Sequence, residues 1–213
     1  MQRFFDLFFS TFALLILSPF FILIILILRM TGEGEIFFYQ KRIGKNKKVF
    51  NLIKFATMLK DSENLGAGTI TLKEDFRVLP FGKFLRKTKL NELPQLLNIF
   101  LGHMSVIGPR PLHSKQFYFY SEKDQELISS VVPGLSGLGS IIFRDEEKIL
   151  QKSHDPDKTY KENITPIKAK LEKFYIRNRN IKMYFKLIIL TIFAILFPRY
   201  NMRNFFKELE SGQ

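Results

Sequence analysis

The chain has 213 residues and a formal net charge of +13, and 46% of its residues are hydrophobic. This composition excludes a wholly disordered protein, and the length fits one domain of modest size with appendages. Cysteine is absent, which excludes a disulfide framework and a thiolate metal site. The basic excess indicates partners that carry phosphate: nucleotides, anionic lipid or nucleic acid.

The N-terminal segment is apolar enough to enter a membrane. No residue from Leu7 to Leu28 is charged, and about 20 apolar residues cross a ~30 Å hydrocarbon core. A cleaved signal peptide fits less well, because the stretch is too long and no small-residue cleavage site follows it. Ser18-Pro19 interrupts the segment, and proline removes one helical hydrogen bond. The residues alone leave two alternatives equal: a kinked span, or a re-entrant helix that leaves by the face it entered.

Basic residues predict the side of the membrane on which the rest of the chain lies. Arg3 alone precedes the apolar segment, whereas Arg29 and five lysines and arginines within residues 41–48 follow it. Because positive residues mark the cytoplasmic side, we expect the globular part in the cytosol.

The next residues predict a β-hairpin close to the membrane. Residues 36–39 and 49–53 are rich in strand-favouring side chains, with a basic turn at residues 44–47 between them. The turn is either simply solvated or attracted to anionic lipid, at about 1 kcal/mol per basic residue. Residues 61–75 are polar and contain glycine, which is typical of a loop.

Residues 90–100 predict a helix that begins beside charged groups. Its apolar side chains recur at three- and four-residue steps: Leu93, Leu96, Leu97 and Phe100. With Pro94 in the first turn, Asn91 is the expected N-cap and Glu92 lies just inside the helix. Arg86 precedes this end by about one turn, so an anion or a metal–phosphate group fits here. This segment alone favours a simpler interpretation than a binding site, in which Asn91 and Glu92 only cap the helix.

Two later segments have restricted or permissive backbones. In Gly108-Pro109-Arg110-Pro111 the prolines fix the chain on both sides of one guanidinium, which suits bidentate contact with phosphate. The alternative is a rigid turn with a solvated arginine.

The glycine-rich residues 133–139 match neither dinucleotide nor P-loop fingerprints. The three scattered histidines do not predict a zinc site.

The C-terminal third predicts two helices. The first covers Ile164–Arg179. The second contains the eleven-residue apolar run Leu187–Phe197, which is too short to span a bilayer. Basic residues flank this run: Lys182, Lys186, Arg199 and Arg203. Such a helix suits a membrane interface, with a buried core helix or an oligomer contact as the alternatives. We therefore expect residues 1–30 in the membrane, a cytosolic domain over 31–180, an interfacial helix over 181–203 and a polar tail over 204–213.

Several motifs, taken together, resemble one family. They are Ser18-Pro19, residues 54–58 (Lys-Phe-Ala-Thr-Met), Arg86, residues 91–96 (Asn-Glu-Leu-Pro-Gln-Leu), residues 102–111 and residues 133–137. Each is weak alone, but their order and spacing resemble the small monotopic phosphoglycosyl transferases, also called bacterial sugar transferases. The resemblance runs from about residue 3 to residue 199.

The resemblance implies a small α/β membrane-associated domain with an N-terminal re-entrant membrane helix, broken at Ser18 and Pro19, and interfacial amphipathic helices. It places the protein at the cytosolic face of the bacterial inner membrane. The implied reaction transfers a phospho-sugar from a UDP-sugar to undecaprenyl phosphate, the first membrane step of glycoconjugate assembly, with Mg²⁺ as cofactor. Membrane lipid is a further implied partner. Nucleic acid is not, because no recognised binding motif occurs. The oligomeric state stays open, a homodimer among the options.

The resemblance also implies roles for single residues. Glu92 matches a metal-associated glutamate. Arg86 and Arg110, the latter held by Pro109 and Pro111, match phosphate-binding arginines. Arg144 aligns with a basic residue that follows the Pro-Gly-x-Ser-Gly segment. Glu172 falls where the family has an aspartate near a tyrosine, here Tyr175.

Three departures from the family pattern concern its chemistry. Asn91 stands where the family has a nucleophilic aspartate, which attacks the phosphate next to the sugar in a ping-pong reaction. His103 replaces an acid, and residues 138–143 lack the usual tryptophan. Three alternatives follow. The chain is an inactive version, natural or engineered, of an active enzyme. Or Glu92 is the nucleophile, or the transfer is direct. Or the protein is a silent relative that binds substrates or a partner enzyme.

Overall fold

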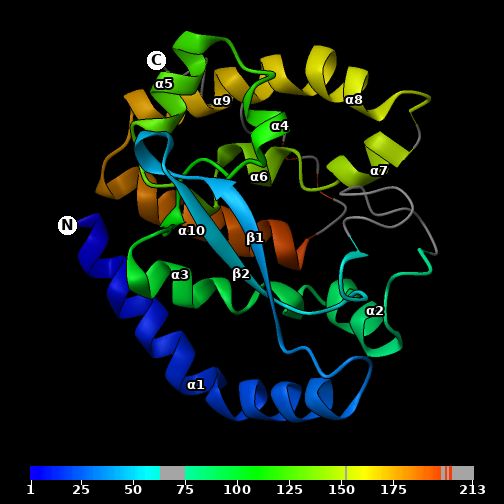
Figure 1. The fold of residues 1–213 in the computed structure, drawn as a ribbon. Coiled ribbons are helices and arrows are strands. Elements are labelled where there is room, and N and C mark those ends of the chain that lie inside the picture. The colour runs from blue at the N-terminus through cyan, green and yellow to red at the C-terminus, as the bar shows by residue number, and fades with distance from the viewer. Residues whose placement is uncertain (63–74, 152, 198–199, 201, 203–213) are drawn as a thin grey trace. The chain divides into compact units, whose positions relative to one another are not determined.

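The computed structural model describes residues 1–62, 75–151, 153–197, 200 and 202 of the chain (Figure 1). The strands are β1 (Phe37–Ile43), β2 (Val49–Phe55), β3 (Ser105–Ile107) and β4 (Gly134–Ser136). The α-helices are α1 (Gln2–Met30), α2 (Pro80–Lys87), α3 (Gln95–Leu101), α4 (Ser114–Phe117), α5 (Glu122–Ser129), α6 (Leu138–Ile142), α7 (Glu146–Gln151), α8 (Pro156–Thr159), α9 (Thr165–Arg177) and α10 (Ile181–Leu196). This mixture of helix and sheet confirms the predicted class in its coarse form.

The chain divides into two compact units. Unit 1 contains residues 1–4, 42–50 and 103–213, and unit 2 contains residues 5–41 and 51–102. Most of the predicted loop at 61–75 (residues 63–74) and the predicted tail at 204–213, with Arg199 and Arg203, lie outside the described residues.

Helix α1 is continuous through Pro19. It bends near its middle (Figure 1), where proline removes a backbone hydrogen bond. The Ser18 hydroxyl donates to the Leu15 carbonyl at 2.8 Å. Among the described helices α1 is the one long and apolar enough to cross a membrane, and only 11% of its apolar window is buried in the protein. Most of its surface therefore requires another apolar environment.

One stripe of α1 forms the core of unit 2. Phe21, Ile24 and Leu28 recur at helical spacing and pack against Phe55 of β2 and Leu85 of α2. The rings of Phe21 and Phe55 lie 5.3 Å apart. This apolar cluster fixes β2 and α2 to the long apolar helix α1.

A buried amide joins β2 to α3 in unit 2. Asn98 has no exposed surface. Its Oδ1 accepts from the Ile53 backbone N–H at 2.9 Å, and its Nδ2 donates to the Asn51 carbonyl at 2.8 Å. The side chain thus supplies hydrogen-bond partners for two backbone groups of β2.

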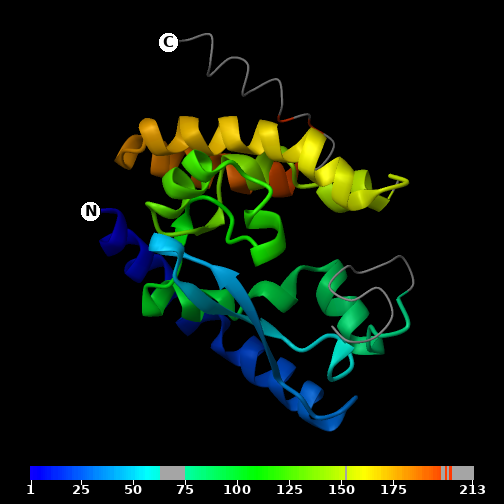
Figure 2. The same cartoon turned by 45° about the horizontal axis from the view of Figure 1, so that its top comes forward.

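Unit 1 is built around a short parallel sheet. Ser105 pairs with Gly134 and Ile107 with Ser136, while α10 packs on both strands and on α6, and α9 packs on α5 and α6 (Figure 2). A Cβ added to Gly134 would lie 2.0 Å from the Gly108 nitrogen. The glycine-rich residues 133–137 therefore allow close approach of two backbones.

The predicted hairpin is confirmed, and its turn at Lys45–Lys47 is a 3₁₀ helix.

The predicted helix over 90–100 is wrong at its start. Leu90–Glu92 form a 3₁₀ turn and α3 begins only at Gln95, so Asn91 is not an N-cap. Around Pro94 the backbone makes three-residue bonds in place of α-helical ones: the Leu93 N–H donates to the Leu90 carbonyl at 3.1 Å, and the Leu96 N–H donates to the Leu93 carbonyl at 3.0 Å.

The two predicted C-terminal helices are present: α9 covers Thr165–Arg177, and α10 covers Ile181–Leu196. A π-helix, Tyr160–Ile164, leads into α9, and the Thr165 hydroxyl donates to the Tyr160 carbonyl at 2.9 Å. No sequence pattern predicted it. Helix α10 begins six residues before its apolar run, where Asn180 Oδ1 accepts from the Met183 N–H. Tyr184, Leu187 and Ala194 are buried on one side of α10.

The bridge made by Asn98 gives a stability prediction. The substitution Asn98→Ala removes two part-buried hydrogen bonds, to the Ile53 N–H and to the Asn51 carbonyl, each worth about 0.5–1.5 kcal/mol. We expect a marked fall in the melting temperature of the detergent-solubilised protein. The matched control is Asn163→Ala, which changes an exposed amide and should leave melting nearly unchanged. Equal melting of the two variants would contradict the bridging role.

Candidate functional site

In unit 2 the structure gathers part of the predicted site. Arg86 lies in the last turn of α2, and Asn91 and Glu92 lie in the 3₁₀ turn that follows. The Lys54 Nζ approaches Glu92 Oε1 at 3.8 Å, and Arg86 Nη1 donates to Thr57 Oγ1 at 3.5 Å. Two cationic side chains, a carboxylate and a hydroxyl are thus set next to the turn that carries Asn91.

Two buried amide atoms in this turn have no hydrogen-bond partner. Asn91 is 8% exposed and its Oδ1 is unpaired among the described residues, as is Nε2 of the 2% exposed Gln95. An unpaired buried polar atom costs about 1–3 kcal/mol. Native proteins retain such atoms where a ligand, ion or water completes them. The turn is therefore a place where a bound group fits.

The oxygen donors at this turn suit a hard cation. Mg²⁺ takes oxygen ligands, commonly one or two carboxylates plus phosphates of the substrate. Glu92 offers a carboxylate and Asn91 Oδ1 an unpaired amide oxygen. Among the described residues no group of three or more His, Cys, Asp and Glu side chains comes together. A cation here would therefore need ligands from a bound phosphate.

In unit 1 the backbone around Arg110 is held on both sides. The Gly108 N–H donates to the Ser136 carbonyl at 2.9 Å, and the Pro109 carbonyl accepts from the Gly134 N–H at 2.8 Å. Pro109 and Pro111 are buried, whereas Arg110 is exposed. The predicted arrangement of a fixed backbone with an outward guanidinium is present.

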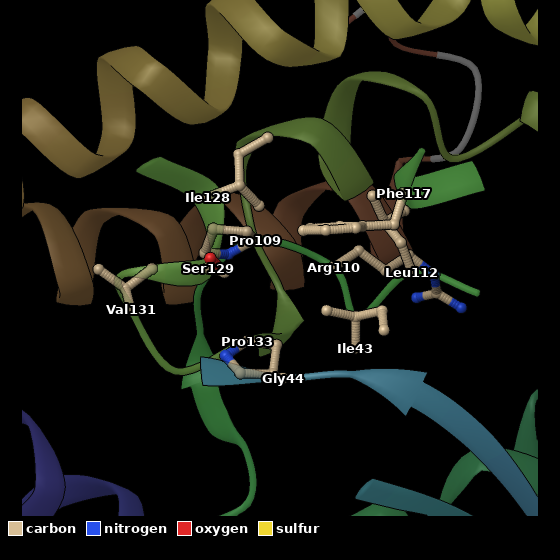
Figure 3. A pocket seen from close by; sticks show the side chains of 10 residues that line it. All are labelled: Ile43, Gly44, Pro109, Arg110, Leu112, Phe117, Ile128, Ser129, Val131 and Pro133. Carbon is tan, nitrogen blue, oxygen red and sulfur yellow. The ribbon is translucent and has the colours of Figure 1, made fainter. Parts of the chain in front are cut away.

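A small pocket adjoins this segment (Figure 3). Its lining is apolar apart from Arg110 and Ser129: Ile43, Gly44, Pro109, Leu112, Phe117, Ile128, Val131 and Pro133. In Figure 3 the Arg110 guanidinium points away from Ile128 and Val131, so the charged group stands at the edge of the apolar lining. An anion held there would have an apolar surface beside it.

Arg144 is engaged within the protein. Its Nη1 donates to the Ala194 carbonyl at 2.6 Å and its Nη2 to the Tyr200 carbonyl at 3.2 Å. Its Nε lies 3.5 Å from a carboxylate oxygen of Asp145. A cation at the end of a helix satisfies carbonyls that have no helical partner. Arg144 therefore fastens the end of α10, and its predicted contact with substrate stays a prediction.

The predicted residues thus fall into two groups, one in each unit. Arg86, Asn91 and Glu92 belong to unit 2, and residues 109–111 and Arg144 belong to unit 1. Sequence reasoning gave no role to three residues that lie beside the unit 2 group: Lys54, Thr57 and Gln95. All three stand inside the short motifs that carry the family resemblance, which was the available signal.

Unit 1 also contains a buried polar cluster on α9. Lys168 forms an ion pair with Glu146, and its ammonium lies 5.2 Å from the centre of the Tyr160 ring. Burial lowers the pKa of Lys168, and the charge of Glu146 opposes that change. Burial raises the pKa of Tyr160, and the charge of Glu146 raises it further. One turn beyond Lys168, Glu172 is buried with Oε2 unpaired among the described residues.

The pKa of Glu172 is raised to about 7, chiefly because burial disfavours the charged carboxylate. The charge of Lys168 and the backbone N–H of Gly139 act in the opposite direction. A Cβ added at position 139 would lie 2.4 Å from Glu172 Oε1, so the carboxylate would have to shift.

The chain matches one protein family and is similar to several known proteins. The family profile described as "Bacterial sugar transferase" matches residues 1–198. "Exopolysaccharide production protein PSS" of Rhizobium leguminosarum is 44% identical over 110 residues, 52% of this chain and 55% of that protein. "UDP-glucose:undecaprenyl-phosphate glucose-1-phosphate transferase" of Klebsiella pneumoniae is 33% identical over 196 residues, 90% of this chain and 39% of that protein.

A third relative has a different sugar in its name. "UDP-N-acetylgalactosamine-undecaprenyl-phosphate N-acetylgalactosaminephosphotransferase" of Aeromonas hydrophila is 30% identical over 200 residues, 92% of this chain and 43% of that protein. The chain therefore spans little more than half of the first of these relatives and less than half of the other two.

The raised pKa of Glu172 predicts a pH-dependent stability. Between its ordinary pKa of 4.5 and about 7, the folded chain keeps a proton that the unfolded chain has released. This contribution to stability is complete below pH 4.5 and is lost as the pH rises through 7. We expect Glu172→Gln to gain stability relative to the parent from about pH 5 to about pH 8, by at most about 3 kcal/mol.

The measurement is the melting temperature across this range. Glu162→Gln, at an exposed position of the π-helix, is the matched control and should follow the parent at every pH. A constant difference between Glu172→Gln and the parent would refute the buried titration.

Proposed function

The chain belongs to the bacterial sugar transferase family, and we propose that it transfers a phospho-sugar from a UDP-sugar to undecaprenyl phosphate. The observation that carries the proposal is the family match over residues 1–198, which includes both groups of predicted site residues. The printed names of the Klebsiella and Aeromonas relatives describe this type of transfer with two different sugars. The proposal therefore leaves the identity of the sugar open.

The proposed location is the cytosolic face of the bacterial inner membrane, with α1 as a re-entrant helix and α10 at the interface. The long apolar surface of α1 and the bend near Pro19 support the first part. For α10 the support is its exposed aliphatic residues, with Ile195 72% exposed, and the exposed Lys182 and Lys186 before them. Apolar and basic groups together suit an interfacial helix. The segment boundaries expected from the sequence are part of this proposal.

Mg²⁺ is the proposed cofactor, held by Glu92 and the Asn91 amide oxygen. The unpaired Asn91 Oδ1 and the adjacent carboxylate support this assignment. When bound, the ion neutralises negative charge on the phosphates. Lys54, at 3.8 Å from Glu92, holds that carboxylate near the turn before any ligand arrives. Arg86 and Arg110 would each bind phosphate oxygens as charged hydrogen-bond donors.

Asn91 limits how the transfer proceeds. A neutral amide has no anionic oxygen with which to form a covalent phospho-sugar intermediate. We therefore favour direct displacement. An oxygen of the polyprenol phosphate forms a bond to the phosphorus next to the sugar, while the bond from that phosphorus to the bridging oxygen breaks. UMP leaves with the electron pair, and the product is a polyprenol diphosphate sugar.

The second candidate function is a membrane-bound protein of the same fold that binds substrates without turnover. Asn91 is the observation that favours it, since the amide stands where the family has its nucleophile. His103, at another position of a family acid, is exposed. Both candidates require UDP-sugar binding, and only the first releases UMP.

The test is UMP release from a panel of UDP-sugars with undecaprenyl phosphate and Mg²⁺. We expect release by the parent chain and a faster rate for Asn91→Asp, by roughly 10²-fold or more if the nucleophile is restored. Mass spectrometry should detect a covalent phospho-sugar adduct on Asn91→Asp and none on the parent. A silent parent with an active Asn91→Asp would favour the binding protein, and silence of both with every sugar would count against the transferase.

A separate prediction concerns binding. Arg110→Ala removes charged hydrogen bonds to phosphate worth about 1.5–3 kcal/mol, so the Kd for the UDP-sugar should rise roughly 10–100-fold. Calorimetry with the purified full chain measures this. Arg179→Ala, at another exposed arginine, should bind as the parent does. If both variants bind equally, Arg110 does not contact the nucleotide sugar.

A further inference from the structure

Helix α2 has an outward face of unusual composition. Its exposed residues recur at three- and four-residue steps: Pro80, Lys83, Phe84 and Lys87. The Phe84 side chain is 52% exposed, although an aromatic ring of this size is ordinarily buried. Exposed Lys89 follows the helix. In the described part of the chain, no ion pair includes a lysine of this face.

The opposite face of α2 packs on the membrane helix. Leu85 is fully buried in the cluster formed by Phe21, Ile24 and Leu28 of α1, and Phe81 packs against the same cluster. The exposed face of α2 therefore belongs to the same rigid packing as α1, whose own surface is largely apolar and exposed. In Figure 1 both helices lie in unit 2 with α2 beside the C-terminal half of α1.

A second aromatic side chain is presented just before α2. Phe76 is 73% exposed, whereas its two neighbours are buried. Arg77 donates from Nε to Asp75 Oδ1 at 2.8 Å and from Nη2 to Oδ2 at 2.6 Å, in a two-pronged pair. The Val78 segment pairs with Met58. The turn that carries Phe76 is thus fixed, and its ring is held outward by the surrounding structure.

We propose that the exposed face of α2 is a docking surface for anionic phospholipid. Lys83 and Lys87 bind headgroup phosphates, and Phe84 enters the boundary between headgroups and acyl chains. Basic and aromatic residues on one helix face have this preference, and the chain carries the complementary net charge of +13. The inference rests on the proposed membrane attachment through α1 and adds a second, charge-dependent contact.

The surface fits lipid better than a protein partner. The lysines carry flexible stems and strongly hydrated ammonium groups, and Lys is depleted at the core of protein interfaces. At a membrane such side chains keep their charge at headgroup level while their stems lie along apolar surface. The aromatic ring between two lysines adds apolar area to a charge-based contact.

The absence of cysteine makes the surface directly measurable. A polarity-sensitive fluorophore on Phe84→Cys reports whether this face contacts lipid in vesicles that contain phosphatidylglycerol and a shallow spin-labelled lipid. Ile16→Cys, at an exposed position of α1, reports membrane attachment, and Glu122→Cys, at an exposed position of α5, is the aqueous reference. We expect quenching at positions 16 and 84 and none at 122.

The outcomes separate this inference from the proposed attachment. Quenching at 16 with an aqueous signal at 84 overturns the docking surface alone. An aqueous signal at both positions overturns the attachment through α1 and the inference with it. If the fluorophore at position 84 already reports an apolar environment in detergent without lipid, this face contacts protein instead. That outcome also overturns the inference.

The role of charge is tested by a matched pair of variants. Each basic residue near an anionic surface contributes an attraction equivalent to roughly fivefold in the equilibrium. In the protein labelled at position 84, the double substitution Lys83→Gln and Lys87→Gln should lower the equilibrium constant for lipid binding about 25-fold. The pair Lys161→Gln and Lys170→Gln removes the same charge from exposed positions in unit 1 and should have little effect. Equal effects of the two pairs would overturn the headgroup contact.

Discussion

The packing of α1 in the core of unit 2 is the constraint on which the candidate site depends. The buried stripe of α1 contacts Phe55 and Leu85. The residues next to these in the sequence are Lys54 and Arg86, whose side chains reach Glu92 and Thr57. Because each charged residue is adjacent to a core residue, the apolar cluster sets where the charges lie. Helix α1, the proposed membrane anchor, thereby also supports the candidate site.

Asn91 occupies the nucleophile position of this site but lacks the negative charge of the family's aspartate. The residue is buried and its oxygen has no partner among the described residues, so the turn keeps a space that a ligand can complete. An amide oxygen can still coordinate a cation, though more weakly than a carboxylate. The surrounding cations, Lys54 and Arg86, do not depend on Asn91 for their positions. Binding and covalent chemistry are therefore separable in this site, which is why both proposed functions remain consistent with one structure.

The sequence predicted the elements whose signals are local and strong. The apolar length of α1, the strand–turn–strand pattern of the hairpin and the helix over most of 165–177 all follow from composition and periodicity. The start of α3 did not, because the periodic apolar residues continue across Pro94 whereas the backbone hydrogen bonds do not. The π-helix at 160–164 depends on packing of Tyr160 inside unit 1, which no periodicity encodes.

Within the site, the sequence predicted which residues belong to it better than it predicted which residues they contact. Arg86, Glu92 and Arg110 were named from motifs, and their roles toward a substrate or metal stay predictions. The contacts of Arg144 with the end of α10 could not be predicted, since they join residues about fifty positions apart. The unpaired amide of Gln95 was equally hidden, because burial of a glutamine is visible only after folding.

Helix α2 contributes to the core, to the candidate site and to the proposed lipid-docking surface. Its Phe81 and Leu85 pack on α1, its Arg86 turns toward Thr57, and its remaining face carries Lys83 and Phe84. Side chains three positions apart on a helix are neighbours, so Arg86 stands next to Lys83. A phosphate held by the outer lysine is thus close in sequence and along the helix to the arginine of the site. In a reaction whose acceptor phosphate resides in the membrane, one short helix in the headgroup layer would shorten the path from lipid to site.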